Sequence, residues 1–356
     1  MKIYSPADIR DRILMFPKKE LIQLPTPFTK MANLSGELGG PEIYIKRDDL
    51  TGLAFGGNKS RKLEYIIQDA LAKKADTIVT WASLQSNWCM QTAAAARKFG
   101  LKPILVLFKS YDLPPGFDGN LLLDFILEAD IRIKEAEKGK TVSAEYAEQM
   151  IQEVVNEVKK SGHTPYVAPL GGSIPGGDME LPLGAIGYVN ACAEMFEQAA
   201  RLGIIVDSII HSSGSGGTQA GLAVGAKALK KDCRVIGISV SDEKEAFGAD
   251  VLAIAQQTEK ALGLDLDMRK EDILVFDEYI QDGYGIVNKD VAKALRLVFM
   301  TEGIVLDPVY TGKAMVGLID LIRKGYFTKK NTVVFFHTGG TPALFPNRDK
   351  LVEFLR

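Results

Sequence analysis

A lysine that follows two glycines is the first residue in this chain whose setting suggests chemistry. Lys59 lies in Gly56-Gly57-Asn58-Lys59-Ser60 and opens an expected helix. Glycines let the backbone approach a ligand closely. The P-loop pattern of nucleotide hydrolases is not met, because Asn58 stands between Gly57 and Lys59 where that pattern requires Gly-Lys. A nucleotide site is therefore disfavoured, whereas a ligand-binding lysine is favoured over an ordinary surface lysine.

A second candidate is the run of small residues from Ser213 to Thr218, which follows an expected strand and opens a helix. Backbone N–H groups at the start of a helix bind phosphate well, and small side chains leave those groups uncovered. The dinucleotide fingerprint G-x-G-x-x-G fails, because Gln219 occupies its last glycine position. Phosphate binding is favoured over a plain tight turn.

Three further segments carry polar side chains that could contribute to a site. Ser86 and Asn87 could hold a carboxylate or a ring edge, although helix capping alone would explain them. Tyr284 and Tyr310 lie near glycines and could act as acid–base groups, although most loop tyrosines only pack. Thr338 follows a strand and offers a hydroxyl beside Gly339, where a plain turn is equally compatible.

Composition excludes several classes of protein. The 356 residues carry a net charge of −2, which argues against a nucleic-acid binder that depends on massed positive charge. No apolar run reaches the ~20 residues of a membrane span, and the first residues lack a signal-peptide core. Three cysteines are too few for a disulfide framework, so a reduced, cytoplasmic setting is expected. The three histidines are widely separated and no metal-ligand spacing occurs, so no metal site is expected.

The order of the elements predicts an α/β fold. Strands are expected over residues 76–82, 103–108, 130–134, 208–213, 234–240 and 332–337. Helices are expected after Lys59 and over residues 87–99, where Gly100 ends the helix. The Glu- and Lys-rich residues 135–162 are expected to form an exposed helix. Strand–helix alternation predicts parallel sheets covered by helices on both faces.

Ligands in open parallel sheets bind beyond the carboxyl ends of the strands. Four segments rich in Gly, Ser, Thr or Asn meet that rule, namely residues 81–87, 169–177, 212–218 and 337–341. We expect these four segments to converge on one site.

Taken together and in order, the motifs resemble those of one enzyme family. They are LPTP at 24–27, KRDD at 46–49, GGNKSRKLE at 56–64, QSN at 85–87, GSGGT at 214–218, GYG at 283–285, DPVYTGKA at 307–314 and HTGG at 337–340. The series resembles the pyridoxal-phosphate enzymes of fold type II, the tryptophan synthase β superfamily. Within it, the match is to the D-cysteine desulfhydrase and 1-aminocyclopropane-1-carboxylate deaminase branch, and it covers most of the chain.

The resemblance implies a role for each matched residue. Lys59 is expected to form the Schiff base with pyridoxal phosphate, and Thr338 to meet its pyridine nitrogen. Ser86 is expected near the substrate carboxylate, and Tyr284 and Tyr310 are expected to face the substrate. The remaining cofactor contacts are Asn58 and Asn87 beside the ring and the backbone amides of Gly214, Ser215, Gly216, Gly217 and Thr218 around the phosphate.

The activity implied is an α,β-elimination on a small amino acid, with D-cysteine converted to pyruvate, hydrogen sulfide and ammonia. Lys59, once released by the substrate, is a natural base for the α-proton. Deaminases of the branch carry a glutamate where Thr311 stands, so elimination is favoured over ring opening. The alternatives are a 1-aminocyclopropane-1-carboxylate deaminase, a lyase for another β-substituted amino acid, and a non-catalytic pyridoxal-phosphate-binding or regulatory protein.

Two features depart from the family pattern. Trp88 and Met90 stand where the family usually has His or Gln and then Arg, and the Trp88 indole could narrow the pocket or point into the core. Residues 174–182 are extra relative to the family pattern, are expected near the rim of the active site, and add the negative charges of Asp178 and Glu180. A cationic or larger amino acid therefore remains an alternative substrate.

The resemblance also implies the organisation of the molecule. A large cofactor-binding domain is expected from residues 1–54 and 168–356, and a small α/β domain from residues 55–167, with the cofactor in the cleft between them. A homodimer acting on a small amino acid is expected, with no nucleic-acid or membrane partner.

Overall fold

The strands of the protein form two separate sheets in the computed structural model, which describes residues 3–110, 116–137, 142, 144–229 and 232–356. The first sheet has the order β1-β2-β10-β7-β8-β9, and the second has the order β5-β4-β3-β6. The strands of the first sheet are β1 (Phe28–Lys30), β2 (Glu42–Arg47), β7 (Ser208–Ser213), β8 (Arg234–Ser239), β9 (Leu274–Phe276) and β10 (Thr332–His337). Those of the second are β3 (Thr77–Ser83), β4 (Lys102–Lys109), β5 (Asp130–Glu135) and β6 (Pro165–Val167).

The helices alternate with these strands along the chain. Their bounds are α1 Pro6–Leu14, α2 Ala32–Leu38, η1 Asp48–Leu50, α3 Asn58–Ala72, α4 Asn87–Lys98, α5 Gly119–Ile126, α6 Ala144–Lys160, η2 Leu170–Gly172, α7 Leu183–Arg201, α8 Gly217–Ala228, α9 Lys244–Ala261, η3 Lys270–Asp272, α10 Lys289–Glu302, α11 Thr311–Arg323, η4 Thr341–Asn347 and α12 Arg348–Leu355. Among the described helices, none combines the length and the hydropathy that a membrane span requires.

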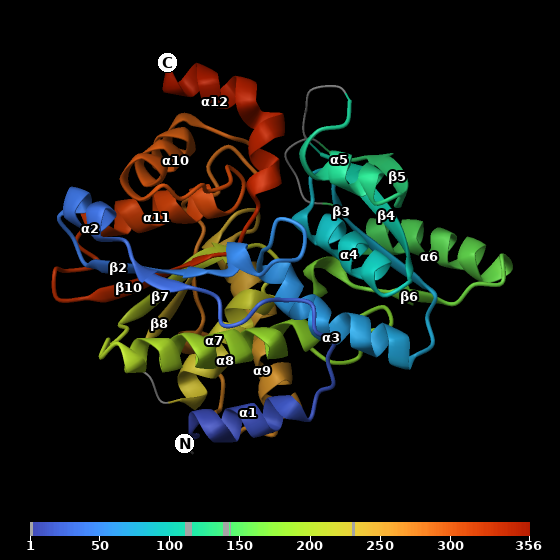
Figure 1. The fold of residues 1–356 in the computed structure, drawn as a ribbon, viewed down its shortest axis with the longest axis horizontal. Helices are drawn as coiled ribbons and strands as arrows, with labels where there is room; N and C mark the ends of the chain where they lie inside the picture. The colour runs from blue at the N-terminus through green and yellow to red at the C-terminus, as the bar shows by residue number, and fades with distance from the viewer. Residues whose placement is uncertain (1–2, 111–115, 138–141, 143, 230–231) are drawn as a thin grey trace.

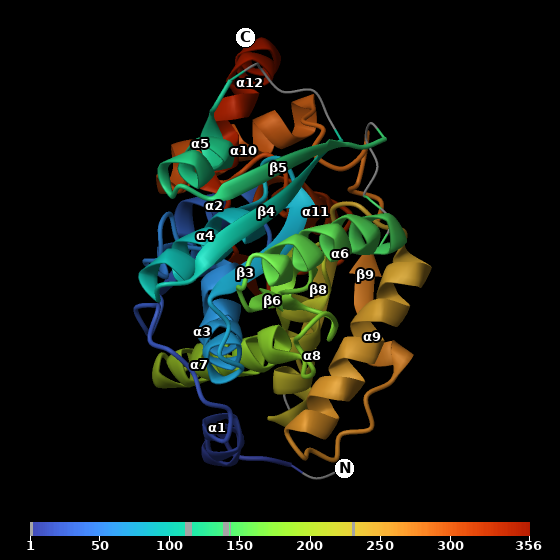
Figure 2. The ribbon, with the colours of Figure 1, turned by 90° about the vertical axis from the view of Figure 1, so that its right-hand side faces the viewer.

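Helices cover both faces of each sheet, as Figures 1 and 2 show. In the first sheet, α7, α8 and α9 lie on one face and α2, α10 and α11 on the other, and each layer has its own hydrophobic core. In the second sheet, α4 packs against one face and α6 against the other. Helix α3 contacts both α7 and α4, so it links the two halves of the molecule.

The predicted α/β fold is confirmed, and the long buried strands match their predicted ranges closely. The prediction missed the short strands β1, β6 and β9 and the strand β2. Strand β1 pairs antiparallel with β2, whereas every other pairing is parallel. The four strands of the second sheet fall within residues 55–167, but the proposed domain boundaries themselves remain a prediction.

The expectation of an exposed helix over residues 135–162 is wrong in part. Residues up to Glu135 belong to β5, and the helix α6 begins only at Ala144. One face of α6, which includes Ile151, Val155 and Val158, is buried against the second sheet. The charged residues that suggested exposure occupy only the outer face of an amphipathic helix.

A buried ion pair anchors α3 at its first turn. The Arg61 guanidinium donates from Nε and Nη2 to the two carboxylate oxygens of Asp48, at 2.8 Å each. Glu194 on α7 accepts from Arg61 Nη2 at 2.9 Å and also pairs with Lys46 on β2. Arg61 and Asp48 are almost completely inaccessible to solvent. Removal of one partner from such a pair leaves an uncompensated buried charge.

We expect Arg61→Met to lower the free energy of unfolding by about 3–5 kcal/mol, because the Asp48 carboxylate would stay buried without its bidentate partner. Urea unfolding followed by circular dichroism measures this change. Arg269→Met is the matched control, since Arg269 pairs with Asp267 at the exposed surface, and it should leave the unfolding curve unchanged. Equal losses in the two variants would contradict the prediction.

Candidate active site

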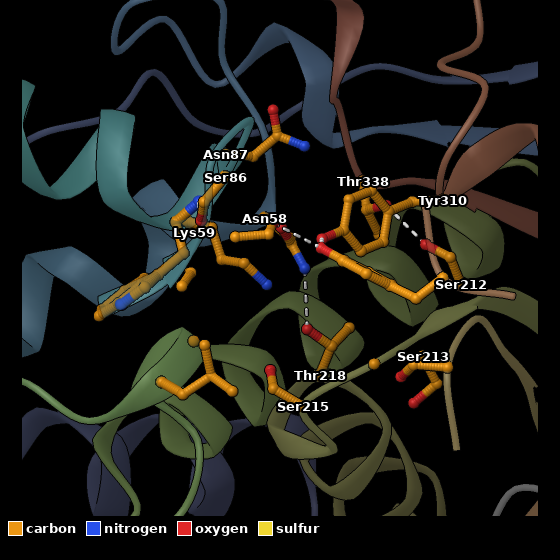
Figure 3. Close-up of a pocket in the computed structure, with 18 of the residues that line it drawn as sticks. Asn58, Lys59, Ser86, Asn87, Ser212, Ser213, Ser215, Thr218, Tyr310 and Thr338 are labelled. Carbon is orange, nitrogen blue, oxygen red and sulfur yellow. Dashed lines mark hydrogen bonds between the residues drawn. The ribbon is translucent and has the colours of Figure 1, made fainter. Parts of the chain in front are cut away.

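The four segments that were expected to converge all line one cavity. It encloses about 1000 Å³, including its open mouth, between the carboxyl ends of strands from both sheets. Figure 3 shows residues of α3, α4 and the start of α8 around this hollow. Lys59 is the only charged side chain among the described lining residues. The geometry therefore isolates one amine in a cavity lined otherwise by hydroxyl, amide, backbone and apolar groups.

Lys59 is aimed into the cavity by the backbone that precedes it. Gly57 has a φ of 130° and precedes α3, and a Cβ there would lie 2.7 Å from Gln91 Nε2 and 3.0 Å from the Thr338 carbonyl oxygen. Only glycine fits this position, which explains the Gly56-Gly57 pair. Burial lowers the pKa of the Lys59 ammonium to about 8. A much larger fraction of Lys59 is therefore the neutral, nucleophilic amine near pH 7 than for an ordinary lysine.

The loop from Gly214 to Thr218 meets α3 directly across the cavity. Asn58 Nδ2 donates to Thr218 Oγ1 at 3.1 Å, a contact visible in Figure 3. Gly216 has a φ of 78°, and the helix α8 begins at Gly217, where a Cβ would lie 2.6 Å from Ser173 Oγ. The first N–H groups of α8 have no partner inside the helix, so the loop can cradle an anion.

A second buried lysine stands behind this loop. Lys62 Nζ donates to Ser173 Oγ at 3.0 Å, and Ser173 Oγ lies 2.9 Å from Ser215 Oγ. Burial, followed by the charge of Lys59, holds the pKa of Lys62 well below its usual range. A bound phosphate would stabilise the charged form of Lys62 through this hydrogen-bond chain.

Ser86 and Asn87 form the start of α4 and face the cavity. Ser86 Oγ accepts the N–H groups of Trp88 and Cys89, both at 3.1 Å, so the capping role is present. The Ser86 O–H is still able to donate toward the cavity. Asn87 Oδ1 accepts from Asn120 Nδ2 at 2.8 Å, which leaves the Asn87 amide group as the donor end of its side chain. Together they offer donors to an anion or a polar ring substituent.

The two tyrosines meet at the opposite wall. The hydroxyl oxygens of Tyr284 and Tyr310 are 2.5 Å apart, and their rings pack edge to face. Lys313 Nζ donates to the carbonyls of Ile280 and Gly283 and so holds the turn that carries Tyr284. Asp307 Oδ2 accepts the Tyr310 N–H at 2.9 Å and fixes the start of α11. Two residues of the DPVYTGKA motif, Asp307 and Lys313, therefore fix the positions of both phenols.

Thr338 lies at the end of β10 and completes the cavity floor. Its Oγ1 is 3.0 Å from Ser212 Oγ at the end of β7 (Figure 3). Ser213, the next residue, has a buried hydroxyl without a partner among the described residues, and it lines the same cavity. These hydroxyls offer neutral hydrogen-bond partners rather than a carboxylate.

The expectation for residues 174–182 is wrong. Within the described residues, none of them lines the cavity. Asp178 instead accepts the N–H of Val167 at 2.7 Å, and a tight turn between Gly176 and Met179 folds the segment against β6. Glu180 approaches Lys73 on the outside of α3. The negative charges of this segment therefore do not act on the cavity, and the argument for a cationic substrate loses its basis.

The sequence left two places for the Trp88 indole, the pocket and the core, and the structure shows features of both. Its side chain is almost fully buried, yet it forms part of the cavity wall. The indole Nε1 donates to Thr80 Oγ1 at 2.7 Å, and Thr80 in turn donates to the Ala168 carbonyl. The indole is thus held as a fixed apolar wall.

Some lining residues were predicted only as part of a segment, and others were not predicted at all. Trp81 and Ser83, at the end of β3, lie within the segment 81–87 that was expected at the site, although neither was given a role. Phe108 and Ser110 at the end of β4 were not named, although the strand-end rule could have found them. Asn120 was not named either; it supports Asn87 from α5 through a contact between segments that have no common motif.

The comparisons with known proteins agree with this geometry. A family model described as "Pyridoxal-phosphate dependent enzyme" matches residues 19–339. A solved structure described as an ACC deaminase homologue superposes with a TM-score of 0.87 at 39% identity, covering 98% of this chain and 99% of that chain. This chain belongs to the pyridoxal-phosphate-dependent enzymes.

Two named relatives place the chain within this family. A Pyrococcus furiosus protein named "Putative 1-aminocyclopropane-1-carboxylate deaminase" is 42% identical over 347 residues, covering 98% of this chain and 99% of the relative. A Yersinia pestis (strain Pestoides F) protein named "D-cysteine desulfhydrase" is 40% identical over 344 residues, covering 95% of this chain and 98% of the relative. The family resemblance, the fold type and the pyridoxal-phosphate cofactor predicted from the sequence are thus confirmed.

The residues of the cavity fit this cofactor. Lys59 offers an amine of lowered pKa, and the Gly214–Thr218 loop offers backbone donors for a phosphate. Ser213, beside that loop, has a buried hydroxyl that finds no hydrogen-bond partner in the described part of the chain. Thr338 and Asn87 present neutral polar groups on other walls of the same cavity. Pyridoxal-phosphate enzymes use a lysine and a phosphate-binding site of this kind.

We expect Gly217→Ala to weaken pyridoxal-phosphate binding at least about tenfold, because the new Cβ would collide with Ser173 and displace the phosphate loop. Equilibrium dialysis read by the visible absorption of the bound cofactor measures the affinity. Gly248→Ala on α9 is the control, since a Cβ there meets nothing within 4 Å. An unchanged affinity in Gly217→Ala would contradict the assignment of this loop to the phosphate.

Proposed function

We propose that this enzyme is a lyase that eliminates the β-substituent of a small, neutral amino acid, with D-cysteine converted to pyruvate, hydrogen sulfide and ammonia. The observation that carries the proposal is the composition of the cavity. It brings one amine, Lys59, together with a pair of phenols, and it contains no acidic side chain among its described lining residues.

Each residue of the cavity has a proposed role in this reaction. Bound pyridoxal phosphate would supply the ring that accepts the electrons left when the α-proton is removed. Lys59 would hold the cofactor and then accept the α-proton as a neutral amine. Ser86 and the start of α4 would bind the substrate carboxylate, because hydroxyl and helix N-terminal donors favour an anion. Tyr284 and Tyr310 would supply a proton to the departing sulfur.

The remaining roles concern the cofactor. We assign the backbone amides of Gly214, Ser215, Gly216, Gly217 and Thr218 to its phosphate. Asn58 and Asn87 are assigned to the edges of its ring, and Thr338 to the ring nitrogen. A neutral hydroxyl at that nitrogen does not enforce a protonated ring, which favours substrates that already carry a good leaving group.

Thr311 supports elimination over the opening of a cyclopropane ring. Its hydroxyl is buried and donates to Asp307 Oδ1 at 2.6 Å, and its side chain is not part of the described cavity lining. No carboxylate therefore takes part from this position. A 1-aminocyclopropane-1-carboxylate deaminase is the second candidate, because the Pyrococcus relatives carry that name.

We expect purified protein with a visible cofactor band to release sulfide and pyruvate from D-cysteine, and to lose both the band and the activity in Lys59→Ala. L-Cysteine, D-serine and 1-aminocyclopropane-1-carboxylate, assayed alongside, test stereochemistry, leaving group and ring opening. Ammonia from the cyclopropane substrate alone would favour the deaminase. A yellow protein that turns over none of the four would favour another β-substituted substrate or a non-catalytic role.

We also propose, from the family resemblance, that the chain acts as a homodimer. Exposed apolar side chains gather on α5, just before it and on the adjoining η4. They are Phe117, Leu122, Phe125, Ile126 and Phe345, which we call the α5 surface. A cluster of exposed apolar side chains is typical of a contact with another protein. The α5 surface is therefore our proposed site of the dimer contact.

We expect the native protein to have the mass of a dimer in analytical ultracentrifugation, and Ile126→Asp to shift it toward the monomer. Ile205→Asp is the control, because Ile205 is 82% exposed and lies outside the α5 surface. A dimer that persists in Ile126→Asp would place the contact elsewhere, and a monomeric native protein would overturn the homodimer.

A further inference from the structure

A third hydroxyl joins the tyrosine pair from the other side of the cavity. Ser83 Oγ lies 3.0 Å from the Tyr284 oxygen, which lies 2.5 Å from the Tyr310 oxygen. All three residues line the cavity. Ser83 ends β3 in the second sheet, whereas Tyr284 and Tyr310 come from segments beside the first sheet. The contact therefore bridges the two halves of the molecule at the site of the reaction.

The order of the three hydroxyls restricts the directions of their protons. Tyr284 lies in the middle and has a single O–H to donate. If Ser83 donates to Tyr284, the Tyr284 proton is directed at Tyr310, and the Tyr310 proton must point elsewhere. If Ser83 accepts from Tyr284, then Tyr310 donates to Tyr284 and its proton is turned away from the substrate.

We propose that Ser83 is a positioning residue that donates to Tyr284 and thereby directs the Tyr310 proton into the cavity. This inference rests on the proposed elimination reaction and names Tyr310 as the group that protonates the departing sulfur. Ser83 itself does not touch the reacting atoms in this scheme.

The proton balance of the step is closed within the chain. When the Cβ–S bond breaks, its electron pair leaves with the sulfur, and the Tyr310 O–H gives its proton to that sulfur. The resulting Tyr310 phenolate accepts the Tyr284 hydrogen bond, and Tyr284 is supported in turn by the Ser83 donor. Two donors in line stabilise the phenolate more than one does. The α-proton goes to Lys59, so no outside reagent is needed.

Burial and nearby acidic groups oppose ionisation of Tyr284, and its hydrogen-bonded hydroxyls favour ionisation. Burial raises the pKa of Tyr284, and its hydrogen bonds with Ser83 and Tyr310 act in the opposite direction. Asp307 and Cys89 also raise its pKa. The contact with Ser83 is thus one of two hydrogen bonds that favour negative charge on Tyr284.

The test compares two substrates in the loaded enzyme and in Ser83→Ala, Ser83→Thr and Thr77→Val. Sulfide leaving from D-cysteine needs a proton, whereas chloride leaving from β-chloro-D-alanine does not. We expect Ser83→Ala to lower kcat for D-cysteine about tenfold, with little change in KM or in β-chloro-D-alanine turnover. Ser83→Thr retains the hydroxyl and should restore the rate. Thr77→Val removes a hydroxyl at the opposite end of β3 and should leave the turnover of both substrates unchanged.

A second measurement does not depend on the substrate. In protein labelled at tyrosine Cζ with carbon-13, with Tyr284 assigned from the Tyr284→Phe spectrum, Ser83→Ala should raise the pKa of Tyr284. Equal losses on both substrates, or an unchanged Tyr284 titration, would overturn the role of Ser83 alone. If the wild-type enzyme uses neither substrate, the proposed function fails, and the Tyr284 titration still decides the inference about Ser83.

Discussion

The position of α3 is the constraint on which the site depends. Arg61 lies two residues after Lys59, and 3.6 residues per turn place these side chains on roughly opposite sides of the helix. The buried pair between Arg61 and Asp48 therefore holds one side of α3 against the protein and turns Lys59 to the other side, into the cavity. The close fit of Gly57 against Gln91 and Thr338 fixes where α3 begins relative to the cavity.

Around this amine, the site is assembled from the ends of strands that belong to different sheets. In the first sheet, Ser213 ends β7 and Thr338 follows β10. In the second, Ser83 ends β3 and Ser86 follows it. Each contributes a short polar group and no formal charge. A neutral lining leaves room for a cofactor that brings its own charged phosphate. Among the described lining residues, no carboxylate is present to hold Lys59 protonated.

Much of this arrangement could be predicted from the sequence. The long buried strands and the loops after them stand out because runs of Val, Ile and Leu alternate with amphipathic helices, and parallel sheets place their ligands at the strand ends. Short strands such as β1 and β9 were missed because three residues carry no periodic signal. The segment 174–182 was misplaced because it continues the segment 169–177 that was expected at the site, whereas a local turn folds it onto β6.

The sequence by itself determined the fold class, the family and its pyridoxal-phosphate cofactor, since these follow from motifs read within short segments. Only the tertiary structure decided how distant segments meet. The contact of Ser83 with Tyr284 spans 201 residues, and that of Asn58 with Thr218 spans 160. No local pattern encodes such pairs, because they arise when two sheets pack around α3. The direction of Lys59 has the same origin, because the pairing of Arg61 with Asp48 and Glu194 joins α3 to distant segments.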